Sequence, residues 1–274
     1  MSLPRIEGAV TIVTGASSGI GHAAAREFAR AGARVVLASR NEPKLRELER
    51  SLEREGREAL VVPTDVTRDD QVRAMIAATL ARFGRVDILI CNAGVGLFSP
   101  VREIPQAALR RVFEVNFFGV VRCVQAALPS MLARESGLIQ IVSSVIGLRA
   151  VPGYAGYCAT KFAVGALAES LRVEVAGRGV RVQVVYPGLT ATAFPQNSIL
   201  PGPEPRSYPV PPMSADRVGR IMVRAARRGS RDQVISAGGR LLTLLDRLSP
   251  ALVDYILARS MAGRIPVDAG APPD

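Results

Sequence analysis

Residues 14–21 read TGASSGIG; they directly follow the apolar run 10–13 and precede a segment with helical periodicity. A glycine-rich turn between a strand and a helix is the usual context of a phosphate site, because free backbone N–H groups and the helix dipole favour an anion there. Gly15 permits a tight turn, Gly19 lets the backbone approach a pyrophosphate, and Gly21 lets the helix pack against the strand. A turn with a purely structural role is the alternative. We predict that a dinucleotide binds at Gly15, Ser17, Ser18, Gly19, Ile20 and Gly21.

Short apolar runs alternate with helix-period segments along the chain, which predicts βαβ units around a parallel sheet. Strands of such a sheet are buried on both faces, so the runs need not alternate polar and apolar residues. The predicted fold is therefore α/β: a Rossmann-type, doubly wound parallel sheet of about seven strands with helices on both faces. The predicted strands are 10–13, 35–38, 59–62, 88–91, 138–142, 180–185 and, weakly, 233–235.

Helix signals lie between these runs. Starts and stops at proline, threonine and glycine predict crossover helices over 19–32, 43–56 and 67–84. A longer helical segment, 105–134, contains Asn116 and Gly119, which both have low helix propensity. This local inconsistency points to a functional reason for those two residues.

The C-terminal third has two unusual segments. Seven prolines between 195 and 212 exclude a continuous helix there and predict a long loop or lid, or else a disordered excursion. Leucine-rich residues 241–261 have helical periodicity broken by Pro250, and they must cover the domain, a partner subunit, a lipophilic pocket or a membrane surface. We expect one domain over 1–274, with a core at 9–190, a lid region at 191–228 and a helical extension at 240–262.

Composition excludes several classes of function. The net charge of +11 comes almost entirely from arginines spread among glutamates, which predicts solvated helix faces and no nucleic-acid partner. Three cysteines without ligand spacing predict neither a disulfide framework nor a metal site, and a single histidine, His22, disfavours a hydrolase triad. The polar first eight residues and the lack of an apolar run of about 20 residues predict a cytoplasmic protein.

The end of the second predicted strand bears on cofactor choice. It reads Ala38-Ser39-Arg40-Asn41, where the common dinucleotide fingerprint has an acidic residue for the ribose 2′-hydroxyl. A carboxylate would repel a 2′-phosphate, whereas the Arg40 guanidinium would bind it through charge-assisted hydrogen bonds. Ser39 and Arg40 therefore predict NADP(H), although an arginine facing solvent is the alternative in so arginine-rich a chain.

Tyr157 and Lys161 are four residues apart in the helical segment 154–176, so they share one face. A phenol is a poor acid or base at neutral pH, but a nearby ammonium and a cationic nicotinamide would favour its phenolate. We interpret the pair as an acid–base unit.

Together, residues 14–21, Asn92-Ala93-Gly94, Asn116, Ser144 and Tyr157-Cys158-Ala159-Thr160-Lys161 resemble the short-chain dehydrogenase/reductase family over roughly the first 190 residues. The family's catalytic serine lies thirteen residues before the tyrosine, which selects Ser144 over Ser143. The resemblance implies a tetrad of Asn116, Ser144, Tyr157 and Lys161. It also implies cofactor contacts at Asp65, Val66, Asn92, Ala93, Gly94, Tyr157, Lys161, Pro187, Gly188 and Thr192.

The chain departs from many relatives at Cys91, where they have asparagine, and we expect this change to be tolerated. The glycine-rich turn also lacks the basic residue that some NADP-dependent relatives place before its second glycine, so the expected NADP(H) preference depends mainly on Arg40.

The resemblance implies reduction of a carbonyl, or oxidation of an alcohol, by hydride transfer with Tyr157 as general acid or base. Ser144 would hydrogen-bond the carbonyl, Lys161 the nicotinamide ribose, and Asn116 a proton-relay water. We expect a small, lipophilic carbonyl or alcohol substrate and a homodimer or homotetramer. A non-catalytic NADP(H)-binding regulator, a sugar-nucleotide epimerase or dehydratase, and a membrane-surface protein are the alternatives.

Overall fold

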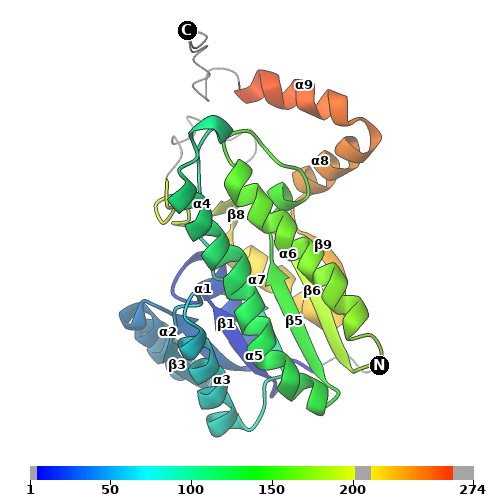
Figure 1. The fold of residues 1–274 in the computed structure, drawn as a ribbon. Helices are drawn as coiled ribbons and strands as arrows, with labels where there is room; N and C mark the ends of the chain where they lie inside the picture. Colours follow the sequence, from blue (N-terminus) through cyan, green and yellow to red (C-terminus); the bar gives the residue numbers. More distant parts are fainter. Residues whose placement is uncertain (1–4, 201–210, 262–274) are drawn as a thin grey trace.

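Seven parallel strands form one sheet in the computed structural model, which describes residues 5–200 and 211–261 (Figure 1). The strand order is β3-β2-β1-β4-β5-β6-β9, so the chain reverses its direction across the sheet between β1 and β4. This order confirms the predicted Rossmann-type fold. The strands are β1 (Val10–Thr14), β2 (Arg34–Ser39), β3 (Ala59–Pro63), β4 (Ile88–Cys91), β5 (Gly137–Val142), β6 (Val180–Tyr186) and β9 (Asp232–Val234).

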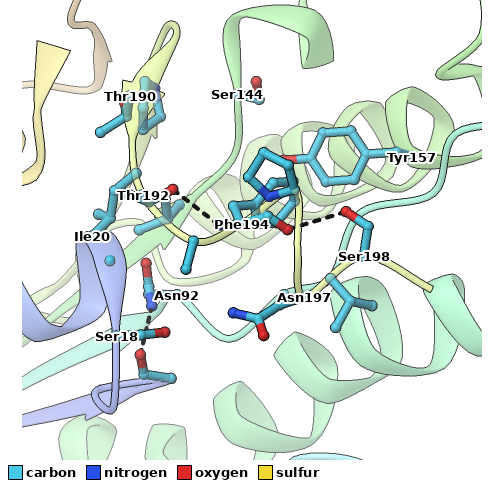
Figure 2. Close-up of a pocket in the computed structure, with 18 of the residues that line it drawn as sticks. Ser18, Ile20, Asn92, Ser144, Tyr157, Thr190, Thr192, Phe194, Asn197 and Ser198 are labelled. Atoms are coloured by element: carbon cyan, nitrogen blue, oxygen red, sulfur yellow. Dashed lines mark hydrogen bonds between the residues drawn. The ribbon is translucent and has the colours of Figure 1, made fainter. Parts of the chain in front are cut away.

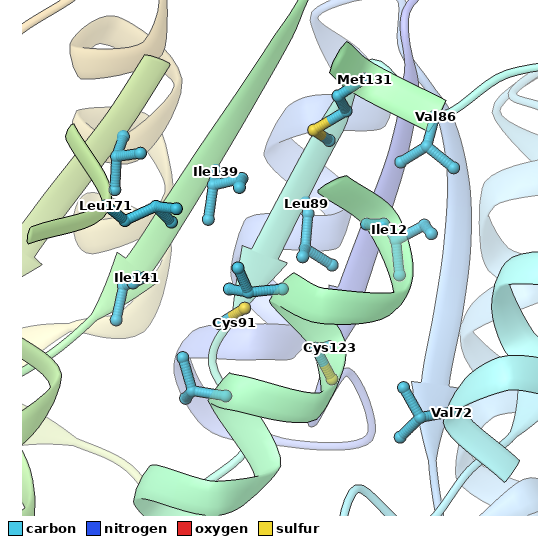
Figure 3. Packing of buried hydrophobic residues seen from close by; sticks show 14 of the residues in the cluster. Ile12, Val72, Val86, Leu89, Cys91, Cys123, Met131, Ile139, Ile141 and Leu171 are labelled. Carbon is cyan, nitrogen blue, oxygen red and sulfur yellow. The ribbon is translucent and has the colours of Figure 1, made fainter. Parts of the chain in front are cut away.

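Helices cover both faces of the sheet and bury its apolar side chains. One face packs against α1 (Gly19–Arg30), α2 (Glu42–Arg54) and α7 (Ala215–Arg228). The other face packs against α3 (Asp69–Phe83), α5 (Gly119–Ala133) and α6 (Ala155–Glu174). Figure 3 shows Cys91 of β4 and Cys123 of α5 within this second core, so Cys91 takes an apolar packing position.

The long helical segment predicted over 105–134 is interrupted. It consists of α4 (Gln106–Phe113), a π-helical turn η2 (Glu114–Phe118) that contains Asn116, and α5. A Cβ on Gly119 would lie 2.8 Å from Cγ2 of Val66, so the glycine lets the helix approach the loop after β3. Both unusual residues therefore have a structural reason, and π turns are frequent at functional sites.

The helical stretch Gln106–Ala133 is also long and apolar enough to cross a membrane, contrary to our expectation that no segment of that kind is present. Its apolar side chains form part of the hydrophobic core instead, because they are buried against the sheet. These residues are Val120, Cys123, Val124, Ala127 and Met131.

The predicted lid region, 191–228, differs from the structure at its C-terminal end. Within it, α7 packs along α1 and buries Val218 and Met222 in the sheet core. This part of the region therefore belongs to the core of the domain, and a lid role for the rest of it stays a prediction. A short parallel pair, β7 (Thr190–Ala191) with β8 (Met213–Ser214), brackets the proline-rich segment, of which Pro201, Pro203, Pro205 and Pro209 lie outside the described residues.

Two C-terminal helices, α8 (Ala237–Leu248) and α9 (Pro250–Met261), follow β9. Pro250 occupies the first position of α9, where its fixed φ suits a helix start. The pair projects from the body of the protein beyond the carboxyl ends of the strands (Figure 1). Two further short turns, η1 (Val101–Glu103) and η3 (Val145–Gly147), follow β4 and β5.

Candidate active site

A cleft of about 2580 Å³ crosses the carboxyl ends of the central strands. It runs from Ser39 and Arg40 at the end of β2, past the glycine-rich turn, to Ser144 after β5 and Pro187 after β6. All the residues predicted from the sequence to bind cofactor or act in catalysis line it, except Gly21 and Asn116. The topology explains this gathering, since residues that follow parallel strands meet at one edge of the sheet.

The glycine-rich turn is closely packed against the loop after β4. Gly15 and Gly19 have φ of +69° and +56°, and a Cβ on Gly21 would lie 2.2 Å from the carbonyl oxygen of Gly15. The side-chain amide of Asn92 donates to the carbonyl oxygen of Thr14 at 2.9 Å and so holds the turn in place. The first turn of α1 faces the cleft, which fits a bound pyrophosphate.

Arg40 lies exposed at one end of the cleft, next to the N-terminus of α2. The side chain of Asn41 caps that helix by accepting from the backbone N–H of Lys44 at 3.1 Å. Across the cleft, burial opposes ionisation of Asp65, but hydrogen bonds from Thr67 and the charges of Arg40 and Arg111 hold the pKa of its carboxyl below the usual value. This end of the cleft is therefore rich in positive charge.

Tyr157 is 8% exposed, and its ring packs edge-on against Phe194, with ring centroids 5.5 Å apart (Figure 2). Burial raises the pKa of Tyr157 well above that of an ordinary phenol, against the opposing effect of a hydrogen bond with Ser144. Lys161 lies 5.6 Å from the ring centroid. The ammonium thus lies beside the phenol ring, and burial favours the neutral form of Tyr157. The role of the two residues as an acid–base unit stays a prediction.

Lys161 is 5% exposed, and its ammonium donates to the carbonyl oxygen of Val142 at 2.9 Å. Desolvation lowers the pKa of Lys161 to about 8. A buried cation with one hydrogen-bond acceptor keeps donors available for hydroxyl groups in the cleft, as a nicotinamide ribose would supply. The residues present thus fit a nicotinamide dinucleotide.

The two serines after β5 have different surroundings. Both line the cleft, but the Ser143 side chain is buried and donates to the backbone carbonyl oxygen of Lys161 at 2.9 Å, whereas the Ser144 side chain is less buried and accepts from the N–H of Ile146 at 3.3 Å. This placement agrees with the choice of Ser144 as the residue that meets a substrate.

Asn116 is fully buried behind the cleft. Its side chain accepts from Val95 N–H at 2.8 Å and donates to the Val95 carbonyl oxygen at 2.9 Å and to Thr160 Oγ1 at 3.1 Å. It therefore joins the loop after β4 to α6 and positions the Tyr157–Lys161 helix. Its role in a water relay stays a prediction.

Sequence reasoning missed several residues that line the cleft: Phe98, Arg111, Tyr154, Phe194, Ile199 and Arg217. Phe98 and Tyr154 pack edge-on with centroids 5.1 Å apart. The positions of Phe98 and Phe194 in the sequence could have predicted this, because Phe98 follows β4 and Phe194 follows the Pro187-Gly188 turn, and both segments lie at the carboxyl edge of the sheet. Within 5–200 and 211–261 no cluster of three or more histidine, cysteine or acidic side chains is placed to hold a metal ion.

Replacing Lys161 by methionine should change how stability depends on pH. The folded-state pKa of about 8 lies below the unfolded value of 10.5, so the unfolded chain binds more protons between these values. The free energy of unfolding of the wild type, relative to Lys161→Met, should therefore rise by about 3 kcal/mol as pH increases through this window. Urea denaturation of both proteins across the window measures the difference. Lys44→Met, which removes an exposed amine, controls for loss of one charge, and a difference independent of pH would contradict the burial of a cation at Lys161.

Fold and site together define an α/β protein of the Rossmann type with a serine, a tyrosine and a lysine in a cleft at the carboxyl edge of its sheet. The model of the short chain dehydrogenase family matches residues 9–200. A dehydrogenase/reductase SDR family protein 7-like protein of Drosophila melanogaster is 33% identical over 266 residues, which are 93% of this chain and 81% of that protein. An uncharacterised oxidoreductase of Listeria innocua is 39% identical over 189 residues, 68% of this chain and 76% of that protein.

Two solved structures are similar over most of the chain. A short-chain dehydrogenase/reductase of Burkholderia phymatum in complex with NAD has a TM-score of 0.83 at 27% identity, and covers 91% of this chain and 96% of its own. An alcohol dehydrogenase of Thermococcus sibiricus complexed with 5-hydroxy-NADP has a TM-score of 0.73 at 31% identity, and covers 83% and 94%. The chain belongs to the short-chain dehydrogenase/reductase family and is an oxidoreductase of that family.

Proposed function

We propose that the protein interconverts a lipophilic carbonyl compound and its alcohol with NADP(H). The observation that carries this proposal is the convergence of the Tyr157 phenol, the Ser144 hydroxyl and the Lys161 ammonium in one cleft that also contains the glycine-rich turn. Such a constellation suits polarisation and protonation of a carbonyl oxygen at a fixed position.

Tyr157 and Ser144 would act on the substrate oxygen. The neutral Tyr157 phenol donates a proton to it, while the Ser144 hydroxyl hydrogen-bonds the charge that develops there. A bound nicotinamide supplies the hydride. Lys161 would bind the ribose hydroxyls, and its positive charge would favour the phenolate that remains after proton donation. In the oxidative direction the same phenol oxygen accepts the proton.

Arg40 supports NADP(H) over NAD(H). Its exposed guanidinium borders the cleft beyond β2, where the dinucleotide fingerprint places the ribose 2′ position. The similar structures contain either NAD or an NADP derivative, so the preference is a proposal that rests on this side chain.

The lining beside Tyr157 supports a lipophilic substrate. Several apolar and aromatic side chains lie there beside a few polar ones, among them Ser144, Tyr157, Asn197 and Ser198, which is typical of pockets for apolar ligands. The apolar lining residues near this end of the cleft are Phe98, Val151, Leu189, Phe194, Ile199 and Leu242.

A panel of carbonyl and alcohol compounds, assayed with NADPH and NADH at matched concentrations, tests the proposal. We expect turnover of apolar ketones or aldehydes with NADPH. Reduction of small polar carbonyls alone would refute the substrate class. Absence of turnover with every compound, despite NADPH binding, would favour the non-catalytic alternative.

Phe194 should set the size of substrate that reaches Tyr157. Its ring packs on Tyr157, and the hydroxyl of Ser198 donates to its backbone carbonyl oxygen at 3.1 Å (Figure 2). Phe194→Ala should raise kcat/KM for bulky ketones relative to small ones by about tenfold. An apolar pocket distinguishes substrates that differ by one methylene group by roughly this factor, and loss of the ring makes room for the larger ones. Kinetics with a homologous ketone series measure this ratio. Phe118→Ala, at an exposed ring outside the cleft, is the matched control; an unchanged ratio for Phe194→Ala would remove Phe194 from the substrate site.

A further inference from the structure

The helical pair α8–α9 exposes an apolar stripe that no described part of the chain covers. Leu241, Leu244 and Leu248 repeat at three- and four-residue spacing on α8, so they share one face. On α9, Leu252, Tyr255 and Ile256 share a face by the same spacing and complete the set of exposed apolar side chains that we call the stripe. These six side chains are between 47% and 74% exposed. Large exposed apolar patches usually mark a binding surface.

Arginines flank this stripe. Arg240 and Arg247 are seven residues apart, so they lie along one edge of the leucine face of α8, and both are exposed. Arg259 lies one turn beyond Tyr255 on α9 and donates to the tyrosine hydroxyl at 2.9 Å. None of these three arginines forms an ion pair with a residue in 5–200 or 211–261.

The acidic residues of the pair are already bound. Asp246 and Asp254 are its only carboxylates, and both form ion pairs with Arg149 in the loop after η3. Arg149 thus fixes both helices to the domain and offsets one of their two negative charges. Arg240, Arg247 and Arg259 outweigh the charge that is left, so the surface of the pair is apolar and carries a net positive charge.

The rest of the chain offers little to cover the stripe. Outside the described residues, the sequence has six large apolar side chains divided among three separate segments: Met1 and Leu3, Tyr208 and Val210, and Ile265 and Val267. A second copy in a twofold arrangement would bring the flanking arginines of both copies into one interface. These arginines would repel one another, because Asp246 and Asp254 of each copy are already paired with Arg149. Apolar side chains beside arginines that form no ion pair with a described residue instead complement an anionic lipid surface.

We propose that α8–α9 binds the surface of an anionic membrane, with the leucine stripe in the interfacial layer and the arginines on lipid phosphates. The first turn of α8 also lines the catalytic cleft, through Ala237, Gly238, Gly239 and Leu242. The bound surface therefore lies next to the mouth of the cleft, and a lipophilic substrate reaches the site from the lipid side. Surface binding itself does not depend on the proposed reaction.

Co-sedimentation of the full chain with phosphatidylcholine vesicles, with and without phosphatidylglycerol, tests this proposal. We expect binding to the anionic vesicles that weakens with added salt. Leu244→Ser/Leu248→Ser should lower the binding constant by more than about tenfold, since it removes two inserted side chains. Arg240→Gln/Arg247→Gln should lower it by roughly tenfold or more on anionic vesicles only.

Matched variants on other surfaces complete the experiment. Val101→Ser/Val173→Ser removes two exposed apolar side chains, and Arg224→Gln/Arg227→Gln removes two exposed arginines of α7; both should bind like the wild type. Melting temperatures verify that each variant is folded. Equal losses in the controls would overturn the proposal. So would a leucine variant that binds vesicles normally but dissociates from dimer to monomer in sedimentation velocity, since a second copy then covers the stripe.

Discussion

Tyr157→Phe is expected to lower kcat by about a thousandfold, because it removes the proton donor and leaves the rest of the site in place. The ring keeps its packing against Phe194, and the Lys161 ammonium keeps its hydrogen bond to Val142. Steady-state kinetics with the best ketone of the panel measure the loss. Binding of NADPH, followed by fluorescence, should change by less than about threefold, since the phenol oxygen is one contact among many.

Tyr186→Phe is the matched control for this result. Tyr186 is also buried, and burial raises its pKa to about 12, yet it ends β6 outside the cleft. Loss of its hydroxyl should leave kcat within about twofold of the wild type. Wild-type turnover by Tyr157→Phe would show that another group protonates the substrate, and a comparable loss in Tyr186→Phe would show that the effect is one of folding.

The fold was predictable from the sequence because two physical signals agree. Apolar runs fix where buried parallel strands lie, and helix caps fix where the crossovers begin and end. The runs 88–91 and 138–142 match β4 and β5 to within one residue. The glycine-rich turn then identifies the edge of the sheet where the cleft forms, since only that edge receives the carboxyl ends of the strands.

Other features depend on contacts that a linear pattern does not show. Asn116 and Gly119 were recognisable as unusual in a helix, but the π turn and the close approach of Val66 follow from tertiary packing. The prolines from Pro195 to Pro212 predict a loop, and α7 begins just after them. Its apolar and arginine residues repeat with helical period. Phe194 reaches Tyr157 through the path of a loop, which neither periodicity nor composition determines.

Arg40→Asp should reverse the preference between the two nicotinamide cofactors. Loss of the guanidinium removes charge-assisted hydrogen bonds to a 2′-phosphate, and the new carboxylate repels that group. We expect KM for NADPH to rise by about a hundredfold. The same carboxylate can accept a hydrogen bond from a ribose 2′-hydroxyl, so KM for NADH should stay within about threefold or fall. Initial rates with each cofactor at saturating ketone give both values.

The comparison that isolates the effect of Arg40 uses a second exposed arginine nearby. Arg50→Asp makes the same charge change on α2, outside the cleft, and its effect on NADPH should be small and reduced by salt. The effect at Arg40 should persist at high salt, because it comes from direct hydrogen bonds rather than from the long-range field. Equal changes in KM for NADPH and NADH in Arg40→Asp would mean that the side chain does not contact the 2′ position. The protein would then recognise its cofactor only through the turn at 14–21 and the nicotinamide end of the cleft.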